Sequence, residues 1–386
     1  MFFNLDIFGI FLLFMLIKDR LFLDEEYFNG WKISDINYWM LLLVILLYLM
    51  ILIVEVSYKF RLNILFIGLL YLMVVRDLLV FFLFYEIVFI LIMFTIIILG
   101  YRYERLMASF LIIFYSFLFS RPVLIILLVF DYRFLMKEWL NYSVVLMVFF
   151  IGSFIVKFPI FGFHYWLPVA HVEASTIGSM LLAGVLLKLG SLGLLYVIIY
   201  IKFIIKFHWL VVGRVLVILI ILKLSDLKII IAYSSIAHIS VVFYIIILGY
   251  NVGKKGAIYI MFYHGFISPL IFWVVGILAW WKTRSLIVVK LISFSYLFIL
   301  LLFILLILNI GFPPFMGFLS EILILKSIIL NNYIIYVIIF VVLFRCYYNV
   351  YLFWCFNGFI GIVRKVNFFR LDLFLFLLFS LMLNFY

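Results

Sequence analysis

Six ionisable side chains lie inside or directly beside long apolar stretches of the sequence, where water would not solvate their charges. They are Glu86, Lys188, Lys228, His238, His264 and Glu321. A charge near the centre of a bilayer costs roughly 2.5–3.5 kcal/mol on insertion scales, so each such group needs a partner or a water-filled cavity. Glutamate, lysine and histidine can each take up and release a proton when their surroundings change. These residue types therefore predict a relay that moves protons within a membrane.

The order of these groups along the chain predicts which of them meet. Glu86 and Lys188 are central in their apolar runs, so we expect a carboxylate and an ammonium from neighbouring helices. Glu321 is then a separate, distal carboxylate. A row of polar side chains follows Lys228 in the next two runs, namely Tyr233, Ser234, Ser235, His238 and His264. Such a row can carry protons.

Structural roles remain open alternatives for the same groups. Glu86 and Lys188 could form a static ion pair, which by itself is weak evidence of stability. Lys228 could be a connector residue whose ammonium reaches water, and the two histidines could be hydrogen-bonded packing residues. Four further charges are interpreted as helix-end charges or local partners and not as relay members: Glu55, Glu104, Lys326 and Arg345.

The elements that must position these groups follow from composition. The 386 residues are 71% hydrophobic and only 11% charged, whereas a soluble domain carries about a quarter of its residues as charged side chains. Apolar runs of about 20 residues recur along the chain, from one near 2–17 to one near 368–385, and each can cross a bilayer as a helix. The runs are continuously apolar and do not alternate, which excludes a β-barrel. We expect an all-α, polytopic membrane protein of about 13–14 transmembrane helices.

Prolines mark two places where helices should be interrupted. The segment Phe158–Phe163 contains Pro159, and a similar segment, Phe312–Phe318, contains Pro313 and Pro314. A membrane helix tolerates proline mainly where other groups satisfy the freed backbone. Each segment is followed by an apolar helix with an ionisable residue, and repeats with broken helices mark the transport sites of many transporters.

Several classes of function are excluded. The net charge is +12, but the basic residues are scattered singly and form no stripe for nucleic acid. Dinucleotide, Walker and HExxH motifs are absent, and Cys346 and Cys355 have no spacing that would hold a metal or an iron–sulfur cluster. We therefore expect no cofactor and no metal in this chain. No cleavable targeting segment is expected at the N-terminus, and the abundance of Phe, Tyr and Ile favours an organelle genome.

Three blocks of the sequence carry a family resemblance. They are Trp166–Ala174, Leu186–Gly190 and Asp226–His238, supported by Phe84–Glu86 and Gly317–Glu321. Together they closely resemble the chain 4 family of antiporter-like membrane subunits of mitochondrial NADH-ubiquinone oxidoreductase, or complex I. The resemblance covers roughly residues 62–330 and predicts a proton-translocating core there. Residues 1–61 would then be N-terminal helices, shortened relative to the family, and residues 331–386 would be C-terminal helices.

The resemblance implies a fold and a function. The fold would contain two inverted five-helix repeats with interrupted helices. The chain would move protons across the mitochondrial inner membrane while other subunits bind NADH, FMN, iron–sulfur clusters and ubiquinone, and it would be enzymatic only as part of that complex. Its partners would be other membrane-arm subunits, notably neighbouring antiporter-like chains, and phospholipids such as cardiolipin.

By motif, the resemblance also implies a role for each site residue. Glu86 and Lys188 would be the coupled pair of the first half-channel, and Lys228 the central relay. His238 and His264 would belong to the polar axis, and Glu321 would be the distal site.

Departures from the family and a second hypothesis accompany this reading. Val169, Ser175 and Arg284 stand where family members usually carry Lys, Pro and His, and Arg121 replaces a small apolar residue. The alternative is a subunit of an Mrp-type cation/proton antiporter, which shares the fold and the buried charges. A third possibility is a structural spacer of the membrane arm whose charges no longer conduct.

Overall fold

A computed structural model describes most of the chain between residues 33 and 356. The described residues are 33–54, 59–75, 78–100, 104–129, 152–201, 209–280, 285–286, 289, 296–313, 315–328 and 332–356. The predicted apolar runs near 2–17 and 368–385, and most of the run near 142–156, lie outside these ranges. The chain divides into two compact units, residues 1–92 and 93–386, and each unit is considered by itself.

The first unit contains α2 (Ile33–Val54), α3 (Lys59–Val74) and most of α4 (Leu78–Leu99). Helices α2 and α3 pack against each other. Between them, the hydroxyl of Tyr48 donates a hydrogen bond of 2.8 Å to Oδ1 of Asn63. This pairing satisfies two polar groups within an otherwise apolar contact.

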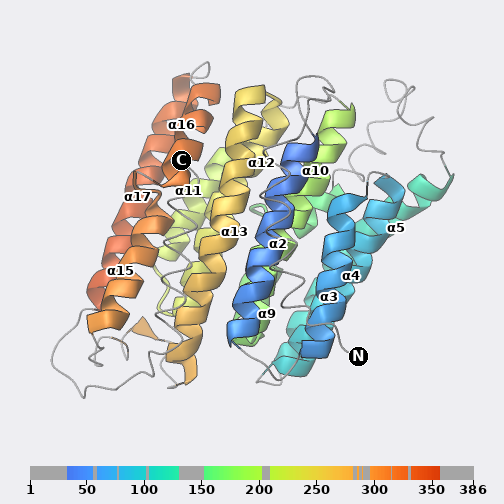
Figure 1. Cartoon of the computed structure of the whole chain (residues 1–386). Helices are drawn as coiled ribbons and strands as arrows, with labels where there is room; N and C mark the ends of the chain where they lie inside the picture. Colours follow the sequence, from blue (N-terminus) through green and yellow to red (C-terminus); the bar gives the residue numbers. More distant parts are fainter. Residues whose placement is uncertain are drawn as a thin grey trace, which may run out of the picture. The chain divides into compact units, whose positions relative to one another are not determined.

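The second unit is also built from helices in the residues that the structure describes (Figure 1). Its elements are α5 (Arg105–Val129), α8 (Trp166–Glu173), α9 (Thr176–Leu181), the π-helical turn η2 (Leu182–Leu186), α10 (Leu187–Ile201), α11 (Trp209–Ile221), α12 (Leu227–Leu248), α13 (Asn251–Trp280), α15 (Tyr296–Ile310), α16 (Met316–Ile328) and α17 (Asn332–Phe356). Helix α13 packs against both α12 and α16, and α17 packs against α15 and α11.

Five helical segments among the described residues are long and apolar enough to cross a membrane. They are Leu79–Leu99, Arg105–Ile125, Thr176–Val197, Leu227–Leu248 and Asn251–Leu278. Aliphatic and aromatic residues fill them without alternation, so a helix is the element that satisfies every backbone group in lipid. The prediction of an all-α membrane protein is confirmed. The number of spans and the two inverted repeats stay predictions.

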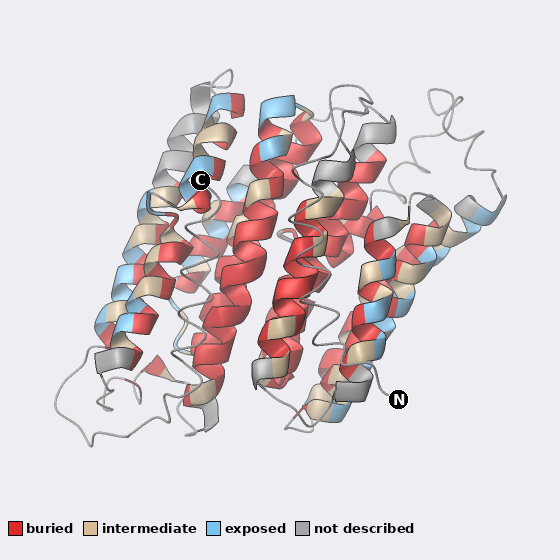
Figure 2. Cartoon of the chain, in the orientation of Figure 1, coloured by how far each residue is buried: buried red, intermediate tan, exposed pale blue. Residues whose placement is uncertain are grey.

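Burial separates the inner helices of the second unit from its outer ones. Figure 2 shows α12 and α13 almost entirely buried, while exposed residues recur along α5, α15 and α17. An 18-residue stretch within Thr176–Val197 is fully buried, whereas only 33% of the corresponding stretch within Arg105–Ile125 is. An apolar helix with an exposed apolar face is the arrangement expected where that face meets lipid. Lys188 on α10, Lys228 on α12 and His264 on α13 are among the buried residues, so their ionisable groups lie away from lipid and bulk water.

Helices are interrupted at both predicted proline segments. The first interruption precedes α8 and contains Gly162 at φ +107°. The second separates Ile310, the last residue of α15, from Met316, the first of α16, and contains Gly311 at φ +81°. Glycine suits both positions because a Cβ strains a backbone at positive φ. At the second, a Cβ would also lie 3.3 Å from Oε1 of Glu321.

Candidate functional site

A buried lysine and a buried histidine form the centre of the site. Lys188, in the first turn of α10, places its Nζ 3.0 Å from Nδ1 of His264 on α13. The same Nζ donates a hydrogen bond to the carbonyl oxygen of Ala183 in the π-helical turn η2. A π-helical turn shifts backbone pairing and often occurs at functional sites. Since a charged ammonium can only donate, Nδ1 of a neutral His264 accepts in this contact.

A second histidine continues the site from α13 to α12. The rings of His238 and His264 have centroids 4.9 Å apart and an angle of 34° between their planes. The two side chains meet because α12 and α13 pack side by side. Lys188, His264 and His238 therefore lie one after another, and their role as a polar axis for protons stays a prediction. Neighbouring imidazoles of this kind can accept and return a proton.

The distal end of the site is an ion pair that the sequence did not predict. Arg345 lies in the middle of α17 and is 5% exposed. Its Nη2 forms an ion pair with Oε1 of Glu321, and its Nη1 lies 3.3 Å from Nδ1 of His238. We interpreted Arg345 as a helix-end charge or a local partner. It is a partner of Glu321, but it also belongs to the row, which an arginine central in a 25-residue apolar helix could have indicated.

These contacts connect five side chains into a polar row: Lys188, His264, His238, Arg345 and Glu321. They come from α10, α13, α12, α17 and α16, so no single helix could position them. Two cavities of about 10 Å³ line the row, one beside Lys188 and one beside Glu321. Each is near the minimum that holds one water molecule, and both are bordered by His238 and His264.

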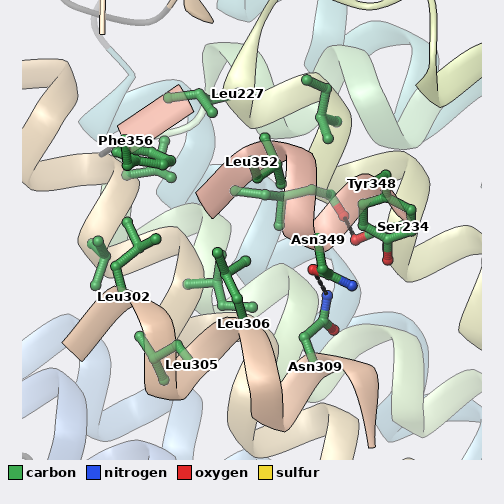
Figure 3. Close-up of a pocket in the computed structure, with 15 residues that line it drawn as sticks. Leu227, Ser234, Leu302, Leu305, Leu306, Asn309, Tyr348, Asn349, Leu352 and Phe356 are labelled. Atoms are coloured by element: carbon green, nitrogen blue, oxygen red, sulfur yellow. Dashed lines mark hydrogen bonds between the residues drawn. The ribbon is translucent and has the colours of Figure 1, made fainter. Parts of the chain in front are cut away.

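A larger cavity adjoins the distal part of the polar row (Figure 3). It measures about 20 Å³ and is enclosed by α12, α13, α15 and α17. Its walls are mostly leucine and isoleucine, but Asn309 and Asn349 lie within it and are joined by a hydrogen bond of 3.1 Å. Asn309 also borders the small cavity beside Glu321. A water molecule in the larger cavity would therefore have amide partners close to the row.

Lys228 is buried but lies away from the polar row. It occupies the first turn of α12, is 2% exposed, and donates a hydrogen bond of 2.9 Å to the carbonyl oxygen of Ala174 after α8. This burial contradicts the alternative of a connector residue whose ammonium reaches water. Ten residues separate Lys228 from His238, or about 15 Å along a helix. Its role as central relay stays a prediction.

Sequence reasoning did not select two further buried groups near the site. His171 on α8 is fully buried, stacks on Phe272 at 4.4 Å, and has no hydrogen-bond partner for either ring nitrogen within the described ranges. Lys188 and Lys228 are its electrostatic neighbours. Lys157, which precedes the first helix interruption, is 1% exposed. The insertion-cost argument applies to Lys157 as it does to the others, and could have found it.

Glu86 lies in the other unit of the chain. It is half-buried in the middle of α4 and belongs to residues 1–92, whereas Lys188 belongs to residues 93–386. The predicted pairing of these two groups therefore stays a prediction. The described residues contain no group of three His, Cys, Asp or Glu side chains that could hold a metal ion.

Comparisons with known proteins connect this arrangement to a family. Residues 75–345, more than half of the chain, match the family model described as NADH:quinone oxidoreductase/Mrp antiporter, transmembrane. The chain is 36% identical over 268 residues to NADH-ubiquinone oxidoreductase chain 4 of Ascaris suum, covering 67% of this chain and 65% of that one. It thus spans less than two thirds of the length of this relative.

Two solved structures have a similar fold. A chain of respiratory complex I from Thermus thermophilus with bound NADH superposes with a TM-score of 0.76 and 20% identity, covering 90% of this chain and 80% of that one. A chain of the Mrp complex from Dietzia sp. superposes with a TM-score of 0.75 and 17% identity, covering 86% and 67%. At these identities the likeness concerns the fold alone.

Proposed function

The chain belongs to the NADH:quinone oxidoreductase/Mrp antiporter family of membrane proteins, and from this premise we propose that it translocates protons as a membrane-arm subunit of respiratory complex I. The observation that carries the proposal is the contact of the buried Lys188 with the buried His264, continued by the half-buried His238. Burying a lysine within a membrane costs free energy, and ionisable groups in such places commonly mark proton pathways. Proton transfer along these three side chains is therefore the function that we propose.

The geometry supports a specific order of transfer. A proton on Nζ of Lys188 can pass to Nδ1 of His264, because 3.0 Å is an ordinary hydrogen-bond distance. The N–H bond of the ammonium breaks as a new N–H bond forms on the imidazole. The next acceptor is His238, whose ring borders the same two small cavities as the ring of His264. A water molecule in either cavity could bridge the two rings.

The other site residues keep the roles that the resemblance implies. Glu86 would form the coupled pair of the first half-channel with Lys188, Lys228 would be the central relay, and Glu321 would be the distal site. The core would comprise residues 62–330, with N-terminal helices in 1–61 and C-terminal helices in 331–386. Two inverted repeats would relate the interruption before α8 to the one before α16.

The relatives suggest where the energy for transport originates. We propose that other subunits bind NADH, FMN, iron–sulfur clusters and ubiquinone, and that this chain binds none of them. The support is the 36% identity to a protein named NADH-ubiquinone oxidoreductase chain 4. We propose, supported by the same likeness, that the chain lies in the mitochondrial inner membrane beside other antiporter-like subunits, with cardiolipin among its lipids.

Replacing the central lysine tests the proposal. Lys188→Met introduces an unbranched side chain of similar length and removes the amino group that carries the proton. In the assembled complex, reconstituted in vesicles, we expect less proton transport per NADH oxidised. Lys223→Met is the matched control, because Lys223 is exposed after α11. Undiminished transport per NADH in Lys188→Met would remove the residue from the pathway and favour the structural-spacer hypothesis.

A second candidate function is a subunit of an Mrp-type antiporter. The specific observation in its favour is the similar TM-score to a chain of the Mrp complex. Copurification separates the two candidates. A complex I subunit should migrate with NADH dehydrogenase activity in native gels of mildly solubilised membranes. A chain that migrates in a complex without that activity, and whose membranes exchange sodium for protons, supports the antiporter.

A further inference from the structure

Arg345 connects three helices at the distal end of the polar row. From α17, its guanidinium contacts Nδ1 of His238 on α12, Oε1 of Glu321 on α16 and, at 2.7 Å, the carbonyl oxygen of Ile310 at the end of α15. The last contact satisfies a carbonyl that the interruption after Ile310 leaves without a helical partner. All three acceptors are held by one planar group in a fixed fork.

The chemistry of arginine makes this position unusual in a proton path. A guanidinium remains protonated under all ordinary conditions and only donates hydrogen bonds. It therefore cannot accept a proton from His238 and pass it to Glu321. While Nη1 lies against Nδ1 of His238, that nitrogen is also occupied by an N–H group. Direct contacts therefore do not carry a proton from His238 to Glu321. The small cavity beside Glu321 borders both residues, but a proton on water there would lie beside the guanidinium charge, which opposes it.

We propose that Arg345 is the gate of the polar row: its guanidinium separates His238 from Glu321 and must move aside before a proton can pass between them. This inference rests on the proposed function, because a gate has meaning only if the row carries protons. In this role Arg345 is a positioning residue and not a carrier. It determines when Glu321 can accept a proton, and it blocks a continuous leak at other times.

The charges around Arg345 supply a reason for it to move. A proton on His264 places a second cation near the guanidinium, and like charges repel strongly where water is excluded. Once the guanidinium moves, Nδ1 of His238 is free to accept that proton, and an N–H bond of His264 breaks as an N–H bond forms on His238. The resulting imidazolium can then replace the guanidinium beside Glu321. The N–H bond of the imidazolium breaks and an O–H bond forms on the carboxylate, so His238 returns to its neutral form and the ion pair with Arg345 is lost.

A second arginine supplies a reason for the gate to close again. Arg214 on α11 is 7% exposed, and its Nε has no hydrogen-bond partner within the described ranges. Its electrostatic neighbours include Arg345 and Glu321. With Glu321 neutral, two buried guanidinium charges lack a counter-ion, which favours release of the proton and restoration of the ion pair. The other titratable neighbours of Arg345 are Tyr263, His264, Cys346 and Tyr348.

Passive proton leak tests the gate without any need for NADH oxidation. The assembled complex in vesicles is exposed to an imposed pH gradient, and proton flux is recorded for Arg345→Met. We expect a leak several-fold above that of the native complex, and a leak that disappears in the double variant with Lys188→Met because protons enter through the row. Arg121→Met is the matched control, since Arg121 is exposed on α5 beside Phe117.

Two results would overturn the gate. One is an assembled Arg345→Met complex whose leak equals that of the native complex. The other is a leak that persists in the double variant, which would place the path outside the row. These outcomes are distinct from failure of the proposed function, which is measured as unchanged NADH-driven transport in Lys188→Met.

A conservative variant keeps the gate testable if Arg345→Met does not assemble. Arg345→Lys retains a cation beside Glu321 but, unlike arginine, a lysine can lose its proton when desolvated. We expect Arg345→Lys complexes to be as tight as native ones at acidic pH and to leak as pH rises, while native complexes stay tight. A leak equal to the native one at every pH would contradict the gate.

Discussion

The ammonium of Lys188 lies 3.0 Å from Nδ1 of His264, although 76 positions separate the two residues in the chain. The π-helical turn η2 directs the lysine toward α13, and the packing of α13 against α9 and η2 brings the imidazole to it. The two residues belong to different helices, α10 and α13, so neither helix alone could form this contact. The pair therefore exists only in the folded second unit, and it is the contact on which the proposed transport depends.

Charge alone should not sustain transport at this position. Lys188→Arg keeps a cation against His264, but a guanidinium does not release its proton. We expect assembly to be normal and proton transfer through this chain to slow by roughly 100-fold or more, the contribution typical of a positioned acid–base group. Proton transport per NADH measures the effect. Native transport in Lys188→Arg would show that this residue serves as a fixed charge.

Removing the acceptor of the lysine should reduce stability as well as transport. In His264→Leu, the buried ammonium of Lys188 loses its imidazole partner, a loss of roughly 1–3 kcal/mol in the free energy of unfolding. Thermal unfolding of the solubilised protein detects it. In the double variant with Lys188→Met the charge is also gone, so we expect part of the stability to return. If the loss of stability in the double variant equals the sum of the losses in the two single variants, a direct contact between the side chains is contradicted.

The interruption before α16 should be sensitive to the side chain at position 311. Gly311→Ala places a Cβ 3.3 Å from Oε1 of Glu321 and strains a backbone at φ +81°. The strain alone costs roughly 1–2 kcal/mol. Gly162→Ala is the control, because its φ is +107° but a Cβ there meets nothing within 4 Å. We expect both to lose stability, and Gly311→Ala alone to change distal proton transfer. Equal proton transport in the two variants would show that the backbone at position 311 does not influence proton transfer at Glu321.

Close packing between α13 and α9 should be equally specific. A Cβ at Gly276 would lie 2.1 Å from Cγ2 of Thr176, so Gly276→Ala overfills the contact that holds α9 and the following turn η2 in place. Overpacking of this kind costs roughly 1–3 kcal/mol. Thr176→Ser removes the methyl group and should restore much of the melting temperature in the double variant. If the second substitution gives no recovery, another contact limits the stability of Gly276→Ala.

The helices could be predicted from the sequence because a chain segment in lipid must satisfy its backbone hydrogen bonds internally, as a helix does. Long apolar runs without alternation specify helices, and the prolines of Phe158–Phe163 and Phe312–Phe318 marked both interruptions. The π-helical turn beside Lys188 was not predictable. Its sequence, Leu182–Leu186, is an ordinary apolar segment, and only packing in the folded protein decides its backbone pairing.

The sequence indicated four members of the polar row but not the contacts that connect them. Lys188, His238, His264 and Glu321 were selected because each is an ionisable group in an apolar run, and the structure brings all four into one row. Arg345 was assigned to local pairing because the sequence does not show which helix α17 contacts. His171 was quoted only within a motif. The amino-acid sequence shows that burying a charge is costly, but it does not show which partner compensates that charge.

The most direct test of the account compares Lys188→Met, His264→Gln and their double variant in the assembled complex, with proton transport per NADH as the readout. Residues that act on one path lose function as a unit, so their losses do not multiply. The account predicts that both single variants fall to the same residual transport and that the double variant falls no further. Native transport per NADH in either single variant, at normal assembly, would contradict it.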